Sequence, residues 1–419
     1  MIKPFFFIEE KRIKREAEIW NAVLSILNAG QSALLIFLIA RLCGDSDAGV
    51  FSLAFSVAYL MIMVGNYGVR NYQSTDVVGQ YNSRDYVLHR IVSCSGMLAL
   101  SVIYVLMHNY DNKKTYVILL CCILKLIESV EDVVHGEYQR CGRLDIAGKC
   151  GTIRYIACFI AFLGTLILSE DMVLAFFVMD MVSIVVFVLL TFCTYPKLIH
   201  KIETKTGAWY KIFVTCFPLF ISTFFNIYIC NASKYSIDRY YSDEIQGYYG
   251  MLFMPVFVIN LLCACIYRPK LVELAEYWNK GDVTQLRKYF GGQMILILAI
   301  GMVAMILSYA FGTQILSIFF GTDLNIFKNE FLVLLLGGTM TAVVDFCNNM
   351  ITILRKQKIM IWIYGIISVL AFICTGPMVQ RMMLMGASVS YCGLLCVQAV
   401  MMVVCFMVMC KKQVNESGI

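Results

Sequence analysis

The feature that most constrains this chain is a succession of long apolar stretches separated by short polar breaks. Hydrophobic residues make up 60% of its 419 residues and charged residues only 15%, whereas a soluble globular protein has about 45–50% and about 25%. No soluble core could bury so many apolar side chains, because such cores stop growing at roughly 250–300 residues. The composition therefore predicts a polytopic membrane protein. It argues against a large catalytic domain, a DNA-binding function and a secreted fate.

The apolar stretches are long enough for helices that cross a bilayer, which need about 20 apolar residues each. They predict an all-α protein with about twelve transmembrane helices. The expected ranges are 17–42, 48–68, 87–108, 115–138, 149–168, 172–193, 210–232, 246–267, 289–311, 328–353, 359–377 and 384–410. The outer loops between these ranges are short, so we expect no extracytoplasmic domain.

Lys and Arg residues indicate how these helices are oriented, because cytoplasmic loops carry an excess of both. Most of the 34 basic residues fall in cytoplasmic segments when both termini are placed inside, and this assignment includes Arg90 and Arg154. The net charge of +6 therefore reflects topology and requires no nucleic-acid partner. Residues 1–16 contain too short an apolar run for a signal peptide, and we expect them to form an interfacial helix on the cytoplasmic face.

A weak internal repeat divides the chain into two halves. The stretch RLCGDSDAGVFSLAF, which starts at Arg41, aligns without a gap with RYYSDEIQGYYGMLF, which starts at Arg239. Each copy ends one long helix at the outer face and opens the next. The expected organisation is a six-helix bundle over 17–193, a cytoplasmic linker over 194–209, a second six-helix bundle over 210–410 and a cytoplasmic tail over 411–419.

The densest group of charges inside an expected span is Lys125, Glu128, Glu131, Asp132 and His135. At about 100° per residue, Lys125, Glu128 and Asp132 lie on one face of the helix. That face cannot contact lipid, because a charge inside the bilayer costs about 2.5–3.5 kcal/mol on insertion scales. Two interpretations remain open. The stripe is either a self-neutralising network that pins the helix to its neighbours, or the wall of a hydrated cavity where Lys125 attracts an anion and a carboxylate takes up H⁺ or Na⁺.

Five further charged residues are candidates for function. Asp180 and Asp345 are isolated acids inside spans, and each is either an ion-coupling carboxylate or an acid hydrogen-bonded to a neighbouring helix. Lys234 and Arg239 stand near the outer end of a span, where an interfacial snorkelling pair is the alternative. Arg70, in VGNYGVRNY, either holds a phosphate at the cytoplasmic mouth or is one more positive-inside residue.

Signatures of enzymes and metal sites are missing from the sequence. It contains no G-x-S-x-G, no P-loop, no H-E-x-x-H and no dinucleotide fingerprint, and its four histidines are not paired at ligand spacing. The 18 cysteines are scattered through apolar runs, where we expect them to be small buried hydrophobes. The sequence therefore predicts no catalytic residue, no metal site and no cofactor.

Three stretches carry a resemblance to a known family. IWNAVLSILNAGQSALLIFLIARLCGDSDAGVFSLAFSVAYLM is similar to the first two spans of bacterial polysaccharide flippases, in which a long first helix ends in an Arg-x-x-Gly-Asp-like corner. GNYGVRNYQ and KYSIDRYYSDEIQGYYGMLFMPVFVINLL look like the corresponding stretches of the Wzx type. That type belongs to the multidrug/oligosaccharidyl-lipid/polysaccharide exporter superfamily.

The resemblance implies two six-helix bundles around a central cavity, in the plasma (inner) membrane of a bacterium with both termini cytoplasmic. A protein of this family moves an undecaprenyl-diphosphate-linked oligosaccharide repeat unit, of the O-antigen or capsule kind, from the inner to the outer leaflet. It does so by alternating access and serves surface polysaccharide biosynthesis. The implied partners are the polyprenyl-diphosphate-linked glycan, the lipid bilayer and the polysaccharide polymerase machinery.

The resemblance also implies roles for charged residues of this sequence. Candidate contacts of the diphosphate are Arg70, Lys125, Lys234 and Arg239, and candidate ion-coupling residues are Glu128, Asp132, Asp180 and Asp345. Because acids outnumber Lys125 in its span, a cation-coupled multidrug exporter of the same superfamily is the alternative function. A membrane-embedded polysaccharide polymerase or acyltransferase is a third interpretation, although the large outer loop of the former and the intramembrane His/Arg centre of the latter are missing.

Overall fold

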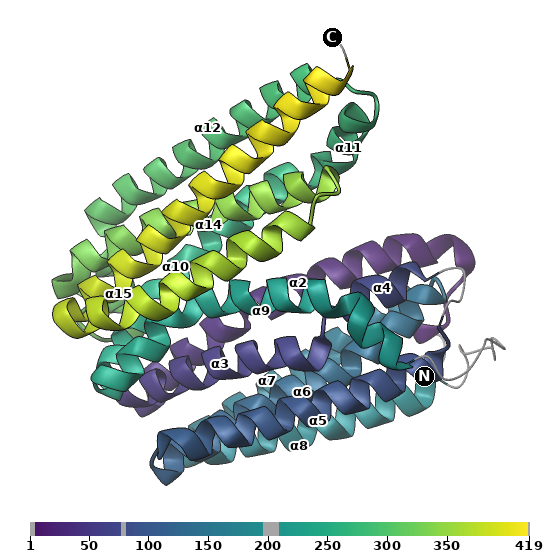
Figure 1. Ribbon diagram of the computed structural model, residues 1–419. Coiled ribbons are helices and arrows are strands. Elements are labelled where there is room, and N and C mark those ends of the chain that lie inside the picture. The colour runs from purple at the N-terminus through teal and green to yellow at the C-terminus, as the bar shows by residue number, and fades with distance from the viewer. Residues whose placement is uncertain (1–4, 77–80, 196–208, 418–419) are drawn as a thin grey trace. The chain divides into compact units, whose positions relative to one another are not determined.

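The computed structural model describes residues 5–76, 81–195 and 209–417, and every regular element within them is a helix (Figure 1). The all-α fold expected from the apolar stretches is therefore confirmed. The chain separates into two compact units, Met1–Phe224 and Phe225–Ile419. The unit boundary falls inside the long helix α9, so the first part of α9 belongs to the first unit and the rest to the second.

The helices of the first unit surround one charged helix, α6. Their bounds are α2 Glu10–Cys43, α3 Asp45–Asn66, α4 Val69–Thr75, α5 Ser83–His108, α6 Asn112–Arg140, α7 Leu144–Ser169, α8 Met172–Thr194 and α9 Trp209–Tyr240. α6 contacts α3, α4, α5, α7 and α8, and α2 packs on α3 and α7. The charged stripe of α6 therefore faces protein and is shielded from lipid.

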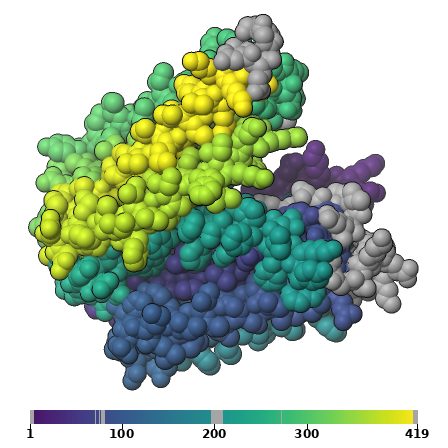
Figure 2. Space-filling view, in the orientation of Figure 1, coloured from purple at the N-terminus to yellow at the C-terminus, as the bar shows by residue number. Residues whose placement is uncertain are grey.

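The second unit is organised around α14, which contacts α10, α12 and α15. Its helices are α10 Asp243–Tyr267, η2 Arg268–Lys270, α11 Leu271–Asn279, α12 Val283–Leu307, the π-helical turn Ser308–Gly312, α13 Thr313–Phe320, η4 Asn325–Phe327, α14 Lys328–Ile353 and α15 Lys358–Ser417. Side chains cover the backbone on the visible face of each unit (Figure 2).

The number of spans agrees with the sequence. Among the described residues, ten helices are long and apolar enough to cross a membrane. α15 counts once among them, although Met383, with φ 51° and ψ −127°, divides it into two helices. α6 is not among them because of its charged residues. With the two parts of α15 and with α6, the expected count of about twelve spans is confirmed.

The outward surfaces of the units are those of a multi-pass membrane protein. Leu168 of α7 is 88% exposed, and Phe192 of α8 and Phe372 of α15 are each 79% exposed. Similar apolar side chains follow one another along α12, including Ile295 and Ile306. Contiguous apolar surface of this extent is rare on soluble monomers, whereas lipid tails solvate it without cost.

The N-terminal segment is held by protein contacts. α2 begins at Glu10 and continues into the first span, so the expected interfacial segment 1–16 has no break before that span. Phe6 is only 2% exposed and belongs to the same buried cluster as Tyr138. Arg143 donates a 2.6 Å hydrogen bond to the carbonyl of Phe6. The location of this segment at the membrane surface stays a prediction.

The expected boundaries of the two bundles also stay a prediction. The linker expected over 194–209 lies almost entirely in residues 196–208, outside the described residues. The tail expected over 411–419 is described as far as Ser417, where it continues α15 as a helix.

Candidate functional site

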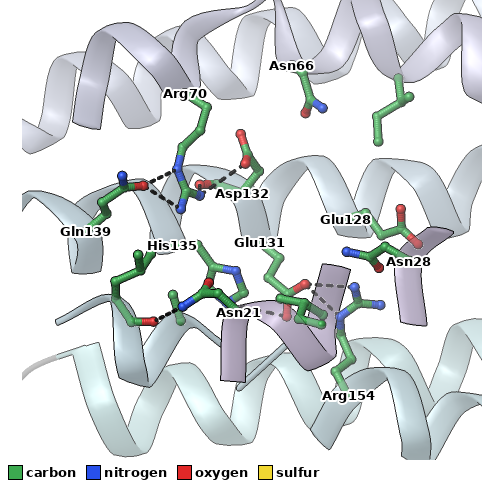
Figure 3. A pocket seen from close by; sticks show the side chains of 14 residues that line it. Asn21, Asn28, Asn66, Arg70, Glu128, Glu131, Asp132, His135, Gln139 and Arg154 are labelled. Atoms are coloured by element: carbon green, nitrogen blue, oxygen red, sulfur yellow. Dashed lines mark hydrogen bonds and ion pairs between the residues drawn. The ribbon is translucent and has the colours of Figure 1, made fainter. Parts of the chain in front are cut away.

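A polar cavity of about 490 Å³ lies inside the first unit. Side chains from α2, α3, α4, α6 and α7 form its walls (Figure 3). The charged and polar ones are Asn21, Asn28, Asn66, Arg70, Glu128, Glu131, Asp132, His135, Gln139 and Arg154. Of the three residues predicted to share one face of span 115–138, Glu128 and Asp132 line this cavity and Lys125 does not.

The sharp turn between α3 and α4 places Arg70 at this cavity. Tyr67 and Gly68 both have positive φ, of 50° and 68°, which ends α3 and starts the short helix α4. A Cβ on Gly68 would lie 2.9 Å from the Cγ of Leu219, so the position favours glycine for space as well as for conformation. The NYGVRNY part of the motif thus turns the chain so that the next helix carries Arg70 towards α6.

Asp132 of α6 forms ion pairs with two arginines. Its Oδ1 accepts a hydrogen bond from Nη1 of Arg70 at 3.1 Å, and its Oδ2 accepts one from Nη2 of Arg90 at 2.8 Å. Arg70 also donates to the backbone carbonyl of Asp132 at 2.8 Å and to Oε1 of Gln139 at 3.1 and 3.2 Å (Figure 3). Arg90 lies on α5 and is not a lining residue of the cavity.

Lys125 is enclosed beside the cavity and is not part of its lining. Only 3% of the residue is exposed, and its ammonium donates 2.7 Å hydrogen bonds to Oε2 of Glu128 and to Oε1 of Gln31. The ring centroid of Phe55 lies 4.9 Å from the same nitrogen. Gln31 also donates to Glu128 at 3.2 Å. Lys125 therefore neutralises and orients Glu128, which does face the cavity.

Glu131 pairs with an arginine of α7. Nη2 and Nε of Arg154 lie 2.7 and 2.9 Å from Oε2 of Glu131, and Nη1 of Arg154 donates to the hydroxyl of Ser183 at 3.0 Å. The other oxygen of Glu131 lies 3.7 Å from Nε2 of His135. Burial of a charge pair is tolerated when its remaining hydrogen-bonding groups are also satisfied, and this pair meets that condition largely through Ser183.

Arg90 and Arg154 are functional candidates that the sequence did not reveal. The positive-inside count placed both in cytoplasmic segments, but α5 and α7 carry them inward to the acids of α6. Each is at most 4% exposed. The available signal was that both lie inside the expected spans 87–108 and 149–168, where a charge needs a partner. These two arginines neutralise acids of span 115–138, and the cytoplasmic side assigned to them stays a prediction.

The network as a whole carries more positive than negative charge. Three carboxylates of α6, those of Glu128, Glu131 and Asp132, pair with four cations of the described residues, counting the neighbouring histidine as neutral. These cations are Lys125, Arg70, Arg90 and Arg154. A surplus cation in a membrane-embedded bundle favours the entry of an anion, because an unpaired charge is costly in a low-dielectric environment.

Asp180 of α8 lies apart from this network. It is fully buried, and neither oxygen of its carboxyl group has a hydrogen-bond partner among the described residues. A buried unpaired carboxylate is highly unfavourable, so the neutral, protonated acid suits this position best. Such an acid can take up and release a proton if the surrounding helices move, which is the property required of an ion-coupling group.

The remaining candidates belong to the second unit. Lys234 of α9 has its ammonium 5.1 Å from the ring centroid of Phe253, and Arg239 has its guanidinium 5.6 Å from that of Tyr240. Neither forms an ion pair within the part of the chain that the structure describes. Asp345 of α14 accepts a 2.6 Å hydrogen bond from the amide of Asn260 on α10. This bond fits the interpretation of Asp345 as an acid hydrogen-bonded to a neighbouring helix.

Known structures resemble this fold, although the sequence matches no protein-family model and no curated protein. The lipid II flippase MurJ in an inward closed conformation gives a TM-score of 0.68 at 12% identity, over 95% of this chain and 90% of that chain. An inward-facing multidrug resistance MATE family transporter of the MOP superfamily gives 0.66 at 10% identity, over 95% and 99%. The MATE transporter VcmN of Vibrio cholerae in its bent form gives 0.58 at 8% identity, over 97% and 99%.

The chain shares the fold of these transporters and of this flippase. The fold expected from the resemblance to the multidrug/oligosaccharidyl-lipid/polysaccharide exporter superfamily is therefore confirmed, and membership of that superfamily stays a prediction. The neighbours named above are transporters and a flippase, not enzymes. The Wzx type within the superfamily stays a prediction.

Proposed function

We propose that this protein is a flippase of the Wzx type. It moves an undecaprenyl-diphosphate-linked oligosaccharide repeat unit from the cytoplasmic to the outer leaflet of a bacterial plasma membrane by alternating access, and so supplies surface polysaccharide biosynthesis. The observation that carries the proposal is the cavity in the first unit, where Arg70 and Arg154 face a polar space within a network that holds a surplus cation. The polymerase that uses the exported unit is its proposed functional partner.

A diphosphate suits this cavity because the network around it has a surplus positive charge and because arginine side chains supply the hydrogen-bond donors. Arginine presents a planar fork of N–H groups that binds phosphate oxygens in pairs, and Arg70 is the arginine of α4 that lines the space. The volume of about 490 Å³ lies in the usual range of ligand sites, about 300–1,000 Å³. Asn28 and Asn66 also line the cavity, and their amides are the proposed partners of sugar hydroxyls.

The other proposed substrate contacts differ in how directly they could reach an anion. Lys125 acts through Glu128, because its ammonium is already bound by Gln31 and Glu128. Lys234 and Arg239 rest against aromatic rings without a carboxylate partner, which leaves their charges available to an anion. We retain Glu128, Asp132, Asp180 and Asp345 as the proposed ion-coupling residues, with Asp180 first because its carboxyl group is buried without a partner.

A cation-coupled multidrug exporter is the second candidate. Two observations favour it: MATE transporters share the fold, and three carboxylates line the cavity. Each of those carboxylates is already paired with a cation of the chain. A cationic drug would have to displace these partners, whereas an anion would add to them, and we therefore place the flippase first.

One reconstitution experiment tests both candidates. Purified full-length protein in proteoliposomes is given a fluorescent polyprenyl-diphosphate oligosaccharide, and the fraction that reaches the opposite leaflet is followed by chemical quenching. The flippase proposal requires transfer faster than in protein-free vesicles and slower transfer by Arg70→Gln. Uptake of a cationic dye such as ethidium, with no transfer of the lipid-linked sugar, would instead support the exporter and refute the flippase.

A further inference from the structure

Two arginines with different surroundings share the carboxylate of Asp132. Nη1 of Arg70 and Nη2 of Arg90 lie 3.1 and 2.8 Å from its two oxygens. One guanidinium is enough to neutralise one carboxylate. The second is therefore surplus, and the surroundings of the two arginines decide which of them is free to change partner.

Arg90 is fixed by the structure around it. Its side chain is 2% exposed. Besides Asp132, its Nη1 donates to the backbone carbonyl of Gly65 at 2.8 Å, and to Oδ1 of Asn66 and the hydroxyl of Ser129 at 2.9 Å each. These partners belong to α3 and α6, so Arg90 cannot leave Asp132 without breaking contacts to two helices.

Arg70 is free to change partner. Its side chain is 26% exposed and lines the cavity. Its side-chain partners, Asp132 and Gln139, lie on the same face of α6 and also line the cavity. If the Arg70 side chain rotated away, Arg90 would still neutralise Asp132, so the carboxylate would not be left without a counter-ion.

We propose that Arg90 is the permanent counter-ion of Asp132, and that Arg70 exchanges Asp132 for the phosphate oxygens of an anionic ligand in the cavity. Arg90 is thus a positioning residue: it keeps Asp132 satisfied while Arg70 binds the ligand. Asp132 competes with the ligand for Arg70 and holds Arg70 when the cavity is empty. This inference rests on the proposed function, because the ligand is the diphosphate group of that substrate.

The exchange predicts an unusual pattern of mutational effects. Asp132→Asn removes the internal competitor of the ligand, so diphosphate should bind about tenfold more tightly. Arg90→Gln leaves Arg70 as the sole counter-ion of Asp132, so binding should weaken about tenfold. The double variant has no carboxylate to satisfy and should bind at least as tightly as the wild type. A purely structural cluster predicts the reverse for Asp132→Asn, since Arg70 and Arg90 both lose their counter-ion and the site loosens.

The test is a binding cycle on purified full-length protein in detergent. The dissociation constant of inorganic pyrophosphate is measured by titration calorimetry for the wild type, the two single variants and the double variant. The same series with a short-chain polyprenyl diphosphate distinguishes a lipid-linked ligand from free diphosphate. Arg84→Gln, an exposed arginine of the same helix as Arg90, is the matched control and should bind like the wild type.

The outcomes separate this inference from the proposed function. Weaker or unchanged binding by Asp132→Asn, or no recovery in the double variant, would overturn the exchange while wild-type binding still supports a diphosphate substrate. No binding of either ligand by the wild type, together with no transfer in vesicles, would overturn both. If Arg90→Gln does not fold, the comparison of Asp132→Asn with the wild type decides the exchange by itself.

Discussion

Arg154 of α7 and Glu131 of α6 form a double contact between the two helices, in which Nη2 and Nε of the arginine lie 2.7 and 2.9 Å from one carboxylate oxygen. Both side chains are at most 8% exposed. Because both groups are largely shielded from water, each charge is stabilised mainly by the opposite charge of its partner.

Removal of one member of this pair should destabilise the protein strongly. Arg154→Ala leaves Glu131 as an uncompensated buried charge, which costs about 3–5 kcal/mol. We expect a clear fall in the thermal unfolding temperature of the purified protein in detergent. The paired substitution Arg154→Met with Glu131→Gln removes both charges and should recover most of the loss. Unfolding of Arg154→Ala at the wild-type temperature would contradict the role of the pair.

Close packing of α2 on α7 should depend on Gly148. A Cβ at this position would lie 2.9 Å from the backbone carbonyl carbon of Trp20 and 3.0 Å from the backbone nitrogen of Asn21, which lines the cavity. Backbone cannot move aside cheaply, so Gly148→Ala should cost about 1–3 kcal/mol and weaken ligand binding. Gly164→Ala on the same helix has open space around it and serves as the control, with an unchanged or higher unfolding temperature.

The N-terminal aromatic segment should shield a cysteine of α7. Phe6 packs in one cluster with Cys150, which is 4% exposed. Phe6→Asp should detach the segment, because it places a charge in an apolar site, and Cys150 should then react with a maleimide several times faster. Site-resolved mass spectrometry distinguishes this thiol from the others. Phe5→Asp is the matched control, since Phe5 is 39% exposed, and equal labelling of the two variants would contradict the prediction.

Asp180 should link transport to an ion gradient. Asp180→Asn keeps the shape of the side chain and removes its ability to exchange a proton, so the protein should remain as stable as the wild type. Transport in proteoliposomes should lose its response to an imposed proton gradient. Glu170→Gln, an exposed acid at the end of α7, is the control. A gradient response of Asp180→Asn equal to that of the wild type would remove Asp180 from the coupling mechanism.

The sequence by itself determined the class of fold and the position of its spans. Apolar runs of bilayer length are local properties, and a helix is the structure that satisfies every backbone group of such a run in lipid. The polar stripe of α6 was also readable, because helical periodicity places Lys125, Glu128 and Asp132 on one face. Even the departure of α6 from an ordinary apolar span follows from composition alone.

Only the tertiary structure decided which charges meet. Arg90 and Arg154 counted as topology signals in the sequence, and the structure places them as the counter-ions of Asp132 and Glu131. Lys125 was a candidate anion contact, and the structure encloses it with Gln31. Periodicity defines the faces of one helix, but the rotation and axial position of its neighbours arise from packing along their whole length. The partners of a buried charge therefore become known only when the helices are in place.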